Sequence, residues 1–489
     1  MLLLSGALAV APAAARPAPD GFADLADRLL PSVVNISTTQ TIKADHKADR
    51  PGSDIPQFPP GSPFEEFFKD FFDHNGQHGG NGRPEAQTHK ATSLGSGFII
   101  DASGYVVTNN HVIADADEIT VILHDDTNLK AELVGRDTKT DIAVLKVKTD
   151  KPLKALGWGD SDAARVGDWV LAIGNPFGLG GSVTAGILSA RQRDINSGPY
   201  DDFLQTDASI NRGNSGGPMF NMDGQVIGIN TAIYSPSGGS IGIGFAIPSA
   251  LAKAVVTEIV NEPDHTVHRG WLGVRIQAVT DEIAESLGLD KPKGALVASV
   301  NDNGPAAVAG IQPGDIVLTF DGRAVTDMRH LPRLVAETPV DKTVPITVWR
   351  KRQETTLQVK VGRLEESEQQ QASAQPDTAK KPQKKDETAT VTTLGLTLSN
   401  ITPELKDKFS LGDDSKGVVV VDVAKDSPGA DKGLQPGDLI MEAAQEEVKS
   451  AGQVNSRIED ARKSGRKSIL LLVDRQGDLR FVALRIDQS

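Results

Sequence analysis

Short apolar segments separated by turn residues fill the chain between residues 95 and 247. In order they read GSGFII, YVVTNNHVI, EITVILH, LKAELVG, DIAVLKV, WVLAIG, VTAGILSA, FLQTDA, QVIGINTA and GIGFAI. Strands joined by such tight turns pair antiparallel, and about a dozen of them suffice for two small β-barrels. The pattern predicts a mainly β domain, either a barrel or a sandwich.

After Pro248 the spacing of the apolar residues changes. The segment SALAKAVVTEIV places its apolar side chains on one face of a helix, and Pro248 stands near the first turn, where proline is tolerated. We therefore expect a helix here that closes the β domain.

The C-terminal half contains a repeated segment. Residues 294–322 align with residues 416–444, and both segments carry QPGD. Such a repeat indicates two copies of one domain. Between them, residues 365–390 hold almost no apolar side chain and cannot offset the entropy of ordering by burial, so a flexible tether is predicted.

Two N-terminal segments follow neither pattern. MLLLSGALAVAPAAA is typical of the apolar region and cleavage site of a signal peptide, although no basic residue precedes it. Because the run is shorter than the roughly 20 residues that span a bilayer, we expect an exported, soluble protein rather than an anchored one. Residues 43–93 are polar and rich in Gly and Pro, as in a functional or disordered loop.

This loop contains one apolar stripe. In PFEEFFKDFF, all the phenylalanines fall on one face of a helix; they are Phe64, Phe67, Phe68, Phe71 and Phe72. Burial of each is worth about 1.5 to 3 kcal/mol. An apolar partner is therefore expected, and the protein's own β domain is one candidate.

Composition narrows the range of functions. A chain of 489 residues is expected to form roughly two to four domains. Its net charge of −14 disfavours nucleic acid and anionic membranes as partners, because both would repel it. The lack of cysteine excludes disulfides, thiolate catalysis and cysteine-ligated zinc. Neither a metal-binding cluster nor a phosphate-binding glycine loop is visible, so no metal and no cofactor is expected, and proteins are the expected partners.

The strongest chemical signal is GNSGGP at 213–218. A serine between glycines can expose its hydroxyl group and direct nearby N–H groups at a developing oxyanion, as acyl transfer requires. The alternative is an ordinary Gly-Ser turn.

A serine nucleophile needs a base and a residue that orients the base. His111 in TNNHVI is the predicted base, and His124, beside the turn sequence DDTN, is the competitor. Asp141 in TDIAVL enters a run apolar enough to be buried, where a carboxylate must be paired, so it is the predicted acid and Asp137 is the alternative. With Ser215 as nucleophile, the order His, Asp, Ser is that of the chymotrypsin-like double barrel.

These motifs, followed by two QPGD-bearing domains, resemble the HtrA family of serine proteases, in particular its DegP- and DegQ-like periplasmic branch. The resemblance runs from about Phe22 to Ile486. It implies that His111, Asp141 and Ser215 are base, acid and nucleophile. It also implies an oxyanion hole in the backbone of Gly213, Asn214 and Ser215, formed by the N–H groups of the first and the last.

The resemblance further implies a substrate class and a domain plan. Such proteases cut unfolded or misfolded envelope proteins after small aliphatic residues, without ATP, in protein quality control under stress, and some act as chaperones. The expected plan is a signal-peptide remnant (1–20), a trypsin-like protease domain (21–265), a PDZ domain (266–363), a linker (364–390) and a second PDZ domain (391–489).

Specificity and regulation are also carried over from the resemblance. The expected S1 pocket residues are Ile210, Ile233 and Tyr234, whose alternative role is ordinary barrel core. Arg193 corresponds, through a gapped alignment, to the sensor-loop arginine that responds to PDZ ligands. The family forms homotrimers that assemble into hexamers or larger cages. The regulatory loop with Phe67, Phe68, Phe71 and Phe72 is expected to reach an opposing trimer; these four residues and Arg193 complete the regulatory set.

Peptide binding is expected in the first PDZ domain. Trp271, Leu272, Gly273 and Val274 resemble the loop that holds the terminal carboxylate of a peptide added to a strand edge. The second domain has LGL at 394–396 but departs from the first after QPGD, so an assembly role is favoured for it. Two alternatives stay open for the whole chain, namely a peptide-binding chaperone or scaffold and a site-specific regulatory protease.

Overall fold

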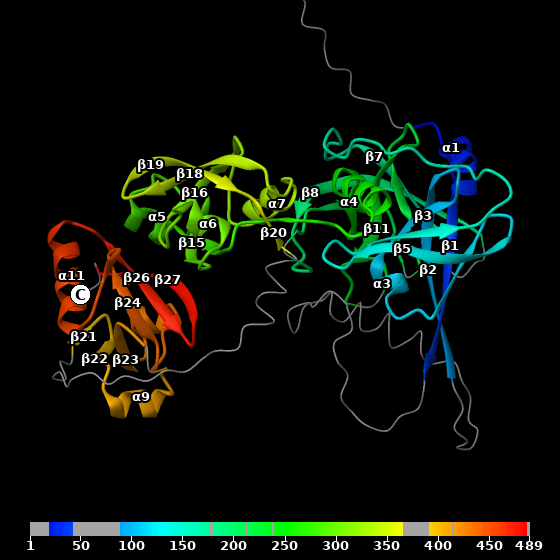
Figure 1. Cartoon of the computed structure of the whole chain (residues 1–489). Coiled ribbons are helices and arrows are strands. Elements are labelled where there is room, and N and C mark those ends of the chain that lie inside the picture. The colour runs from blue at the N-terminus through cyan, green and yellow to red at the C-terminus, as the bar shows by residue number, and fades with distance from the viewer. Residues whose placement is uncertain are drawn as a thin grey trace, which may run out of the picture. The chain divides into compact units, whose positions relative to one another are not determined.

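The computed structural model describes residues 19–42, 89–175, 180–198, 200–211, 213–236, 239–364, 391–412 and 415–486. The chain divides into two compact units, Met1–Val267 and His268–Ser489 (Figure 1). Within the described ranges, no helix is long and apolar enough to cross a membrane.

The first unit consists of two closed antiparallel barrels. Around the first barrel the strands are β1 (Val33–Ile42), β2 (His89–Asp101), β3 (Tyr105–Thr108), β6 (Ile142–Val147), β5 (Asn128–Asp137) and β4 (Glu118–Ile122). Around the second they are β10 (Pro218–Phe220), β11 (Val226–Ile233), β12 (Gly244–Pro248), β9 (Phe203–Thr206), β8 (Ser182–Arg193) and β7 (Trp169–Gly174). The predicted mainly β double barrel is confirmed.

Strand β6 shows how the barrels are joined. Ala143, Leu145 and Val147 fill the first barrel, whereas Ile142 and Val144 belong to the larger core that the second barrel shares. Both faces of the strand are therefore buried, which is why its sequence is a nearly continuous apolar run.

Helix α4 (Ser249–Asn261) packs on the same core through Ala252, Val255, Val256 and Ile259. This confirms the helix predicted after Pro248, which is the residue that precedes its first turn.

Two N-terminal elements were not predicted, helix α1 (Ala23–Leu29) and strand β1. The sequence of β1, VVNISTTQTI, is mostly polar, and its partners β2 and β4 lie far along the chain. Strand β2 begins at His89, inside the range predicted as a loop. The predicted phenylalanine stripe at 64–72 lies outside the described residues.

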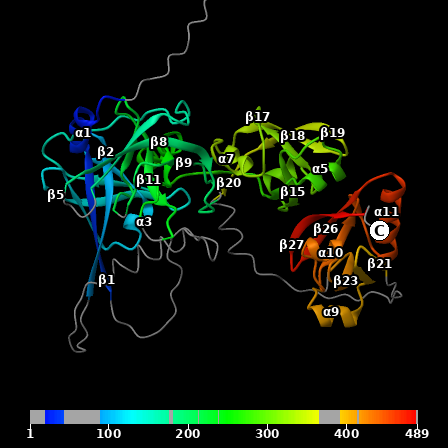
Figure 2. The ribbon, with the colours of Figure 1, turned by 180° about the vertical axis from the view of Figure 1, so that it is seen from behind.

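The second unit contains the two repeat domains (Figure 2). The sheet of the first repeat has the order β14 (Val274–Ala278), β15 (Ala295–Val300), β16 (Ile316–Phe320), β18 (Thr343–Arg350) and β19 (Gln353–Lys360), with β17 (Arg323–Ala324) on β16. A separate pair is formed by β13 (Gly270–Trp271) and β20 (Gly362–Arg363). The helices are α5 (Asp281–Leu287), α6 (Pro305–Val308) and α7 (His330–Ala336).

The second repeat has the strand order β21 (Val391–Thr393), β22 (Leu396–Asn400), β23 (Val418–Val423), β24 (Leu439–Ala443), β26 (Ser468–Arg475) and β27 (Asp478–Arg485), with β25 (Glu446–Glu447) on β24. Its helices are α9 (Pro403–Phe409), α10 (Pro428–Asp431) and α11 (Ala451–Lys463).

The QPGD motif forms the same clamp in both repeats. Arg350 donates two hydrogen bonds to the buried carboxylate of Asp315, at 2.7 and 2.6 Å. Arg475 does the same to Asp438, at 2.6 and 2.6 Å. Each arginine ends a strand of the C-terminal hairpin of its repeat, so the motif fastens the turn before β16 or β24 to that hairpin.

Apolar side chains join the two repeats. They come from α5 and the adjacent strands of the first repeat and from the hairpin β26–β27 of the second: Ile283, Ala284, Leu287, Leu289, Leu296, Ile316, Leu318, Leu470, Leu472, Phe481 and Ala483. At the margin, the Gln277 side chain donates to the backbone carbonyl of Phe481 (2.9 Å) and accepts from its N–H (2.7 Å).

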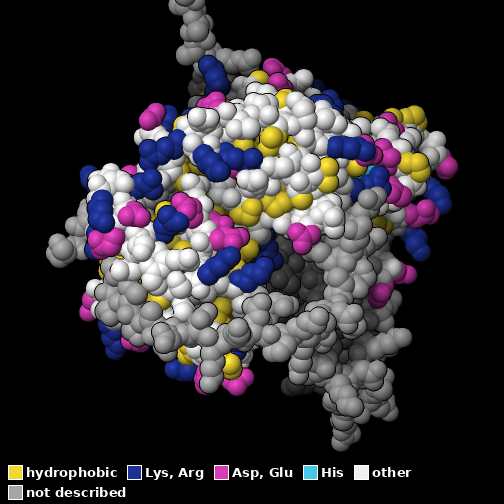
Figure 3. Space-filling model, turned by 60° about the vertical axis from the view of Figure 1, so that its left-hand side comes forward, with side chains coloured by type: hydrophobic (Ala, Val, Ile, Leu, Met, Phe, Trp, Pro, Cys, Tyr) yellow, Lys and Arg dark blue, Asp and Glu magenta, His cyan; other side chains and the backbone are white. Residues whose placement is uncertain are grey.

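On the face seen in Figure 3, the acidic side chains do not form one continuous patch. Lysine and arginine side chains are interspersed there with aspartate and glutamate, and hydrophobic side chains lie between them in small groups. Long-range attraction of a strongly charged partner is therefore not expected of this face.

Candidate active site

His111 is presented by α3 (Asn110–Ile113), a single turn that follows β3. The residue is buried, and its Nδ1 lies 2.6 Å from Oδ2 of Asp141. Its backbone N–H donates to Oδ1 of the same carboxylate at 2.8 Å. Asp141 therefore orients both the ring and the backbone of His111, and Nε2 is the nitrogen at the opposite end of the imidazole ring.

Asp141 has a left-handed backbone conformation, with φ of 57°. Such a conformation costs a residue other than glycine on the order of 1 to 3 kcal/mol. Its carbonyl oxygen accepts hydrogen bonds from the N–H of Asn110 (3.1 Å) and from Nδ2 of Asn109 (2.8 Å). Together with the two bonds to His111, these contacts hold the strained residue in place.

The alternative acid, Asp137, is used differently. Its carboxylate accepts from the N–H of Lys139 (3.3 Å) and from the hydroxyl of Thr140, so it braces the turn that precedes Asp141. The alternative base, His124, lies exposed in a turn. Of the two candidate pairs, the structure brings together His111 and Asp141.

Ser215 lies in the loop between β9 and β10, which depends on glycine. Gly216 has φ of +86°, and a Cβ atom there would lie 2.2 Å from the carbonyl oxygen of Ser96. The Ser215 hydroxyl group, which is buried, donates to the carbonyl of Thr231 in β11 at 3.2 Å. The nucleophile predicted from the sequence thus stands on the second barrel, whereas His111 and Asp141 stand on the first.

Ser96 of β2 ties this loop to the first barrel. Its hydroxyl group donates to the carbonyl of Gly213 (2.5 Å), and its N–H donates to the carbonyl of Ser215 (2.9 Å). The N–H of Asn214 donates within the loop, to the carbonyl of Asn211 at 3.0 Å. The oxyanion role predicted for this loop therefore depends on the N–H groups of Gly213 and Ser215.

The remaining predicted residues keep their roles as predictions. Ile210 and Ile233 are buried in the shared core, and Tyr234 lies half-buried beside it. Arg193 ends β8, and its Nε donates to the side chain of Gln205 at 2.8 Å. The regulatory phenylalanines Phe67, Phe68, Phe71 and Phe72 lie outside the described residues.

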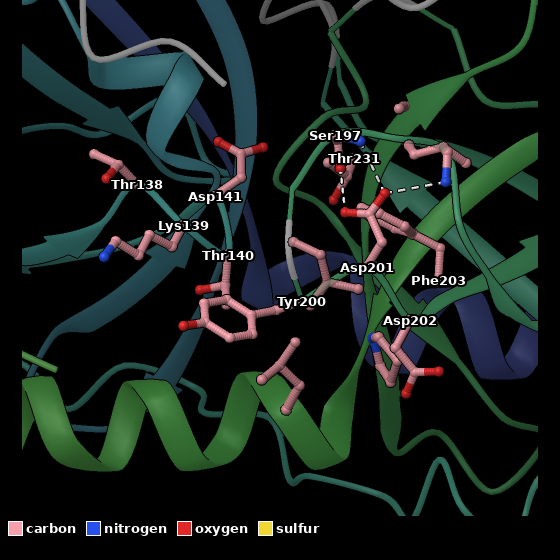
Figure 4. A pocket seen from close by; sticks show the side chains of 15 residues that line it. Thr138, Lys139, Thr140, Asp141, Ser197, Tyr200, Asp201, Asp202, Phe203 and Thr231 are labelled. Atoms are coloured by element: carbon pink, nitrogen blue, oxygen red, sulfur yellow. Dashed lines mark hydrogen bonds between the residues drawn. The ribbon is translucent and has the colours of Figure 1, made fainter. Parts of the chain in front are cut away.

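A cavity adjoins Asp141 on the side of the loop that follows Arg193 (Figure 4). Its lining comes from the turn at 138–141, from residues 195–198 and 200–203, and from β11, β12 and α4. Asp201 stands in its wall; burial raises the pKa of its carboxyl group, although hydrogen bonds from Ser197 and Ile195 oppose the rise. The segment that carries Asp201 therefore forms part of the cavity wall beside Asp141.

Three residues of the site were missed from the sequence, namely Ser96, Asn109 and Thr231. Asn109 lies two residues before the predicted base and Thr231 two residues before the predicted S1 residue Ile233, so proximity in sequence was the only signal. Their hydrogen bonds join positions far apart in the chain, which no local motif reports.

In the first repeat, the loop at 271–274 contains Gly273 with φ of +75°, a backbone conformation that favours glycine. The strand that follows, β14, ends the sheet and, among the described residues, pairs with β15 alone. In the second repeat the equivalent strand β22 has β21 paired along its other edge, through Thr393 and Leu396. The two repeats therefore differ at the edge where a peptide strand could be added.

Comparison with known proteins gives concordant results. Residues 95–229 match the trypsin-like peptidase domain, and residues 270–361 and 392–486 match the PDZ domain. The chain is similar to a probable periplasmic serine endoprotease DegP-like of Brucella suis biovar 1, with 44% identity over 482 residues, 96% of this chain and 90% of the relative. A relative of the same description from Rhizobium meliloti is 44% identical over 494 residues, 97% of this chain and 93% of its own length.

Solved structures agree with this. The HtrA-type protease AlgW with a decapeptide has a TM-score of 0.55 and 44% identity and covers 70% of this chain and 98% of its own. The same protease with a tripeptide has a TM-score of 0.56 and 42% identity, covering 70% and 97%. The resemblance inferred from the motifs is confirmed.

Proposed function

Because this chain belongs to the HtrA family of trypsin-like serine endoproteases, in its periplasmic DegP-like branch, we propose that His111, Asp141 and Ser215 carry its peptidase activity. The observation that supports this most directly is the carboxylate of Asp141, which binds both Nδ1 and the backbone N–H of His111. An imidazole held in this way has one orientation and one tautomer available for proton transfer.

The proposed reaction proceeds through an acyl-enzyme. Ser215 Oγ attacks the carbonyl carbon of the scissile bond, His111 Nε2 takes the hydroxyl proton, and Asp141 stabilises the imidazolium ion. The N–H groups of Gly213 and Ser215 stabilise the oxyanion. His111 then protonates the leaving amine, and water releases the acyl group by the same steps. At rest the Ser215 hydroxyl donates to Thr231, so attack requires it to exchange this acceptor for the imidazole.

The proposed substrates are unfolded or misfolded proteins of the bacterial envelope, cut after small aliphatic residues without ATP. The preference for aliphatic P1 residues is carried over from the family; Ile210 and Ile233, the apolar residues assigned to S1, are buried in the shared core. Relatives described as periplasmic support export to that compartment.

Peptide capture is assigned to the first PDZ domain. HtrA-type structures determined with a decapeptide and a tripeptide support peptide binding in this family. The edge of β14 and the adjacent loop at 271–274 offer backbone groups for strand addition. In the second domain β21 already pairs with β22, which supports an assembly role there. Homotrimers that join into larger cages, chaperone activity, and contact between trimers through the loop at 43–93 belong to the same proposal.

A digest of casein tests the proposal. Wild-type protein is expected to degrade it, whereas Ser215→Ala is expected to lose about 10⁶-fold in kcat, because only the attacking hydroxyl is removed. Cleavage sites mapped by mass spectrometry give the P1 preference. Substrate retained by a folded but inactive Ser215→Ala protein would support the chaperone role, and peptidase activity in a pure Ser215→Ala sample would disprove the assignment of the nucleophile.

A further inference from the structure

Asn109 occupies a helix cap position but does not cap the helix. It precedes α3 with extended backbone (φ −78°, ψ 147°), where an asparagine side chain usually accepts from an N–H of the first turn. Here the side chain makes no such bond. The side chain is buried and forms two hydrogen bonds with residues outside α3, so it serves a role other than helix capping.

Both contacts use the amide Nδ2. It donates to the carbonyl oxygen of Asp141 at 2.8 Å and to Oγ1 of Thr231 at 3.2 Å. A carbonyl oxygen can only accept, so the amide group of Asn109 has to present its nitrogen to Asp141. The Thr231 hydroxyl donates its proton to the carbonyl of Ile229 (2.9 Å), which leaves the oxygen free to accept from Asn109. The direction of every bond is therefore fixed.

The two acceptors belong to different barrels and to different halves of the catalytic machinery. Asp141 orients the base on the first barrel, and Thr231 belongs to β11 of the second. The carbonyl of Thr231 holds the Ser215 hydroxyl at rest. One amide group thus connects the backbone of the acid with the residue that holds the nucleophile.

We propose that Asn109 is a positioning residue of the peptidase, which fixes Asp141 in its left-handed conformation and sets the distance between the acid and the β11 segment that holds Ser215. This inference deepens the function proposed above and depends on it. Asn109 does not touch the reacting atoms; it acts through Asp141 and Thr231. Misplacement of a catalytic group by about 1 Å can reduce the rate on the order of 100-fold, so loss of this amide affects turnover rather than binding.

The test compares four variants with wild type on fluorescently labelled casein. Asn109→Ala is expected to lower kcat by about 10- to 100-fold, with KM changed by no more than about twofold. Thr231→Val, which keeps its carbonyl and its shape, is expected to lower kcat less. In the double variant the losses should not multiply, because Thr231 has lost its link to Asp141 once the amide is gone. A serine-directed fluorophosphonate should label Ser215 more slowly in parallel with kcat.

Ser249→Ala is the matched control. Ser249 is also buried and links two segments, since its hydroxyl donates to the carbonyl of Gly159 (2.8 Å) and accepts from the N–H of Ser161 (3.1 Å). It should lower the unfolding temperature and leave kcat per folded molecule unchanged. A similar fractional loss of kcat in Ser249→Ala and Asn109→Ala would mean that Asn109 is merely structural and would overturn the proposal.

Two further results would overturn the proposal. One is a kcat of folded Asn109→Ala within twofold of the wild-type value, and the other is a double variant in which the losses of kcat from the two single variants multiply. If Asn109→Ala does not fold, Thr231→Val decides alone, and an unchanged kcat in that variant contradicts the proposal. A different result would disprove the peptidase function proposed above, namely that wild-type protein does not cleave casein in a Ser215-dependent way.

Discussion

Asp141 combines a buried carboxylate, bound to His111, with a left-handed backbone. Its place in an apolar run predicted a buried, paired carboxylate, whereas its left-handed backbone could not be predicted, because it depends on the donors at 109–111. The motifs TNNHVI, TDIAVL and GNSGGP were sufficient to name three residues. They were not sufficient to find Ser96 or Asn109, whose contacts with the second barrel exist only once the barrels have packed.

Substitution of each candidate acid distinguishes their roles. Asp141→Asn is expected to lower kcat on casein by about 10⁴-fold, since the amide cannot hold the required tautomer of His111. Asp137→Asn weakens only the hydrogen bonds that hold the turn before Asp141. It is expected to lower the stability of the fold by on the order of 1 kcal/mol, while turnover persists. Steady-state kinetics and thermal unfolding of both variants check this. A comparable fall in kcat for Asp137→Asn would contradict the assignment of the acid.

Among the elements, the barrel strands β3 to β9, β11 and β12 and the second half of β2 follow the apolar segments recognised in the sequence, and α4 follows its helical periodicity. Strand β1 was missed because its residues are mostly polar and its pairing with β2 and β4 is a tertiary effect. The repeated QPGD motif indicated a domain duplication, but its role in fastening a turn to the C-terminal hairpin of each repeat was not predicted. That role requires Arg350 and Arg475, which stand well beyond the motif in each repeat.

The clamp gives a prediction for each repeat. Asp315→Asn and Asp438→Asn leave the guanidinium group facing an uncharged partner, and each is expected to cost about 2 to 3 kcal/mol, below the roughly 3 to 5 kcal/mol of a fully buried pair because the arginines are partly exposed. Urea unfolding followed by circular dichroism measures the loss. Asp302→Asn, on the exposed surface of the first repeat, is the control and should change stability little. Equal stability of clamp variants and control would show that the motif is dispensable.

Helix α5 gives a pH-dependent prediction. Glu282 has its pKa lowered to about 2, first by its own backbone N–H, then by Thr280 and by Lys432 of the second repeat, 3.2 Å away. Because the folded state holds this proton less tightly than the unfolded state, whose ordinary value is 4.5, Glu282 stabilises the fold above that pH and the contribution is lost as the pH falls towards 2. Glu282→Gln should therefore show a smaller drop in unfolding temperature across this range than wild type. Parallel curves for the two proteins would contradict it.

At the scale of the whole molecule, the two PDZ domains are related in sequence and differ at one edge. The protein is expected to bind one apolar C-terminal peptide per chain, measured by calorimetry on Ser215→Ala protein so that the peptide is not cut. Gly273→Ala should weaken binding, because alanine does not readily adopt φ of +75°. Gly395→Ala, at φ of +71° in the second domain, should leave the affinity unchanged. Two peptides bound per chain would refute the assignment of one open edge.

The placement of the proposed catalytic residues on two barrels has a consequence for the newly made chain. A newly made polypeptide carries every residue of the proposed site, yet the barrel of His111 and the loop of Ser215 are joined only after both barrels have closed and Ser96 has bound that loop. Labelling by a serine-directed probe during refolding from urea should therefore lag behind the recovery of tryptophan fluorescence, and labelling that precedes it would argue against this order. Under the function proposed above, an unfinished chain cannot cut its neighbours, because its peptidase site forms only at the end of folding.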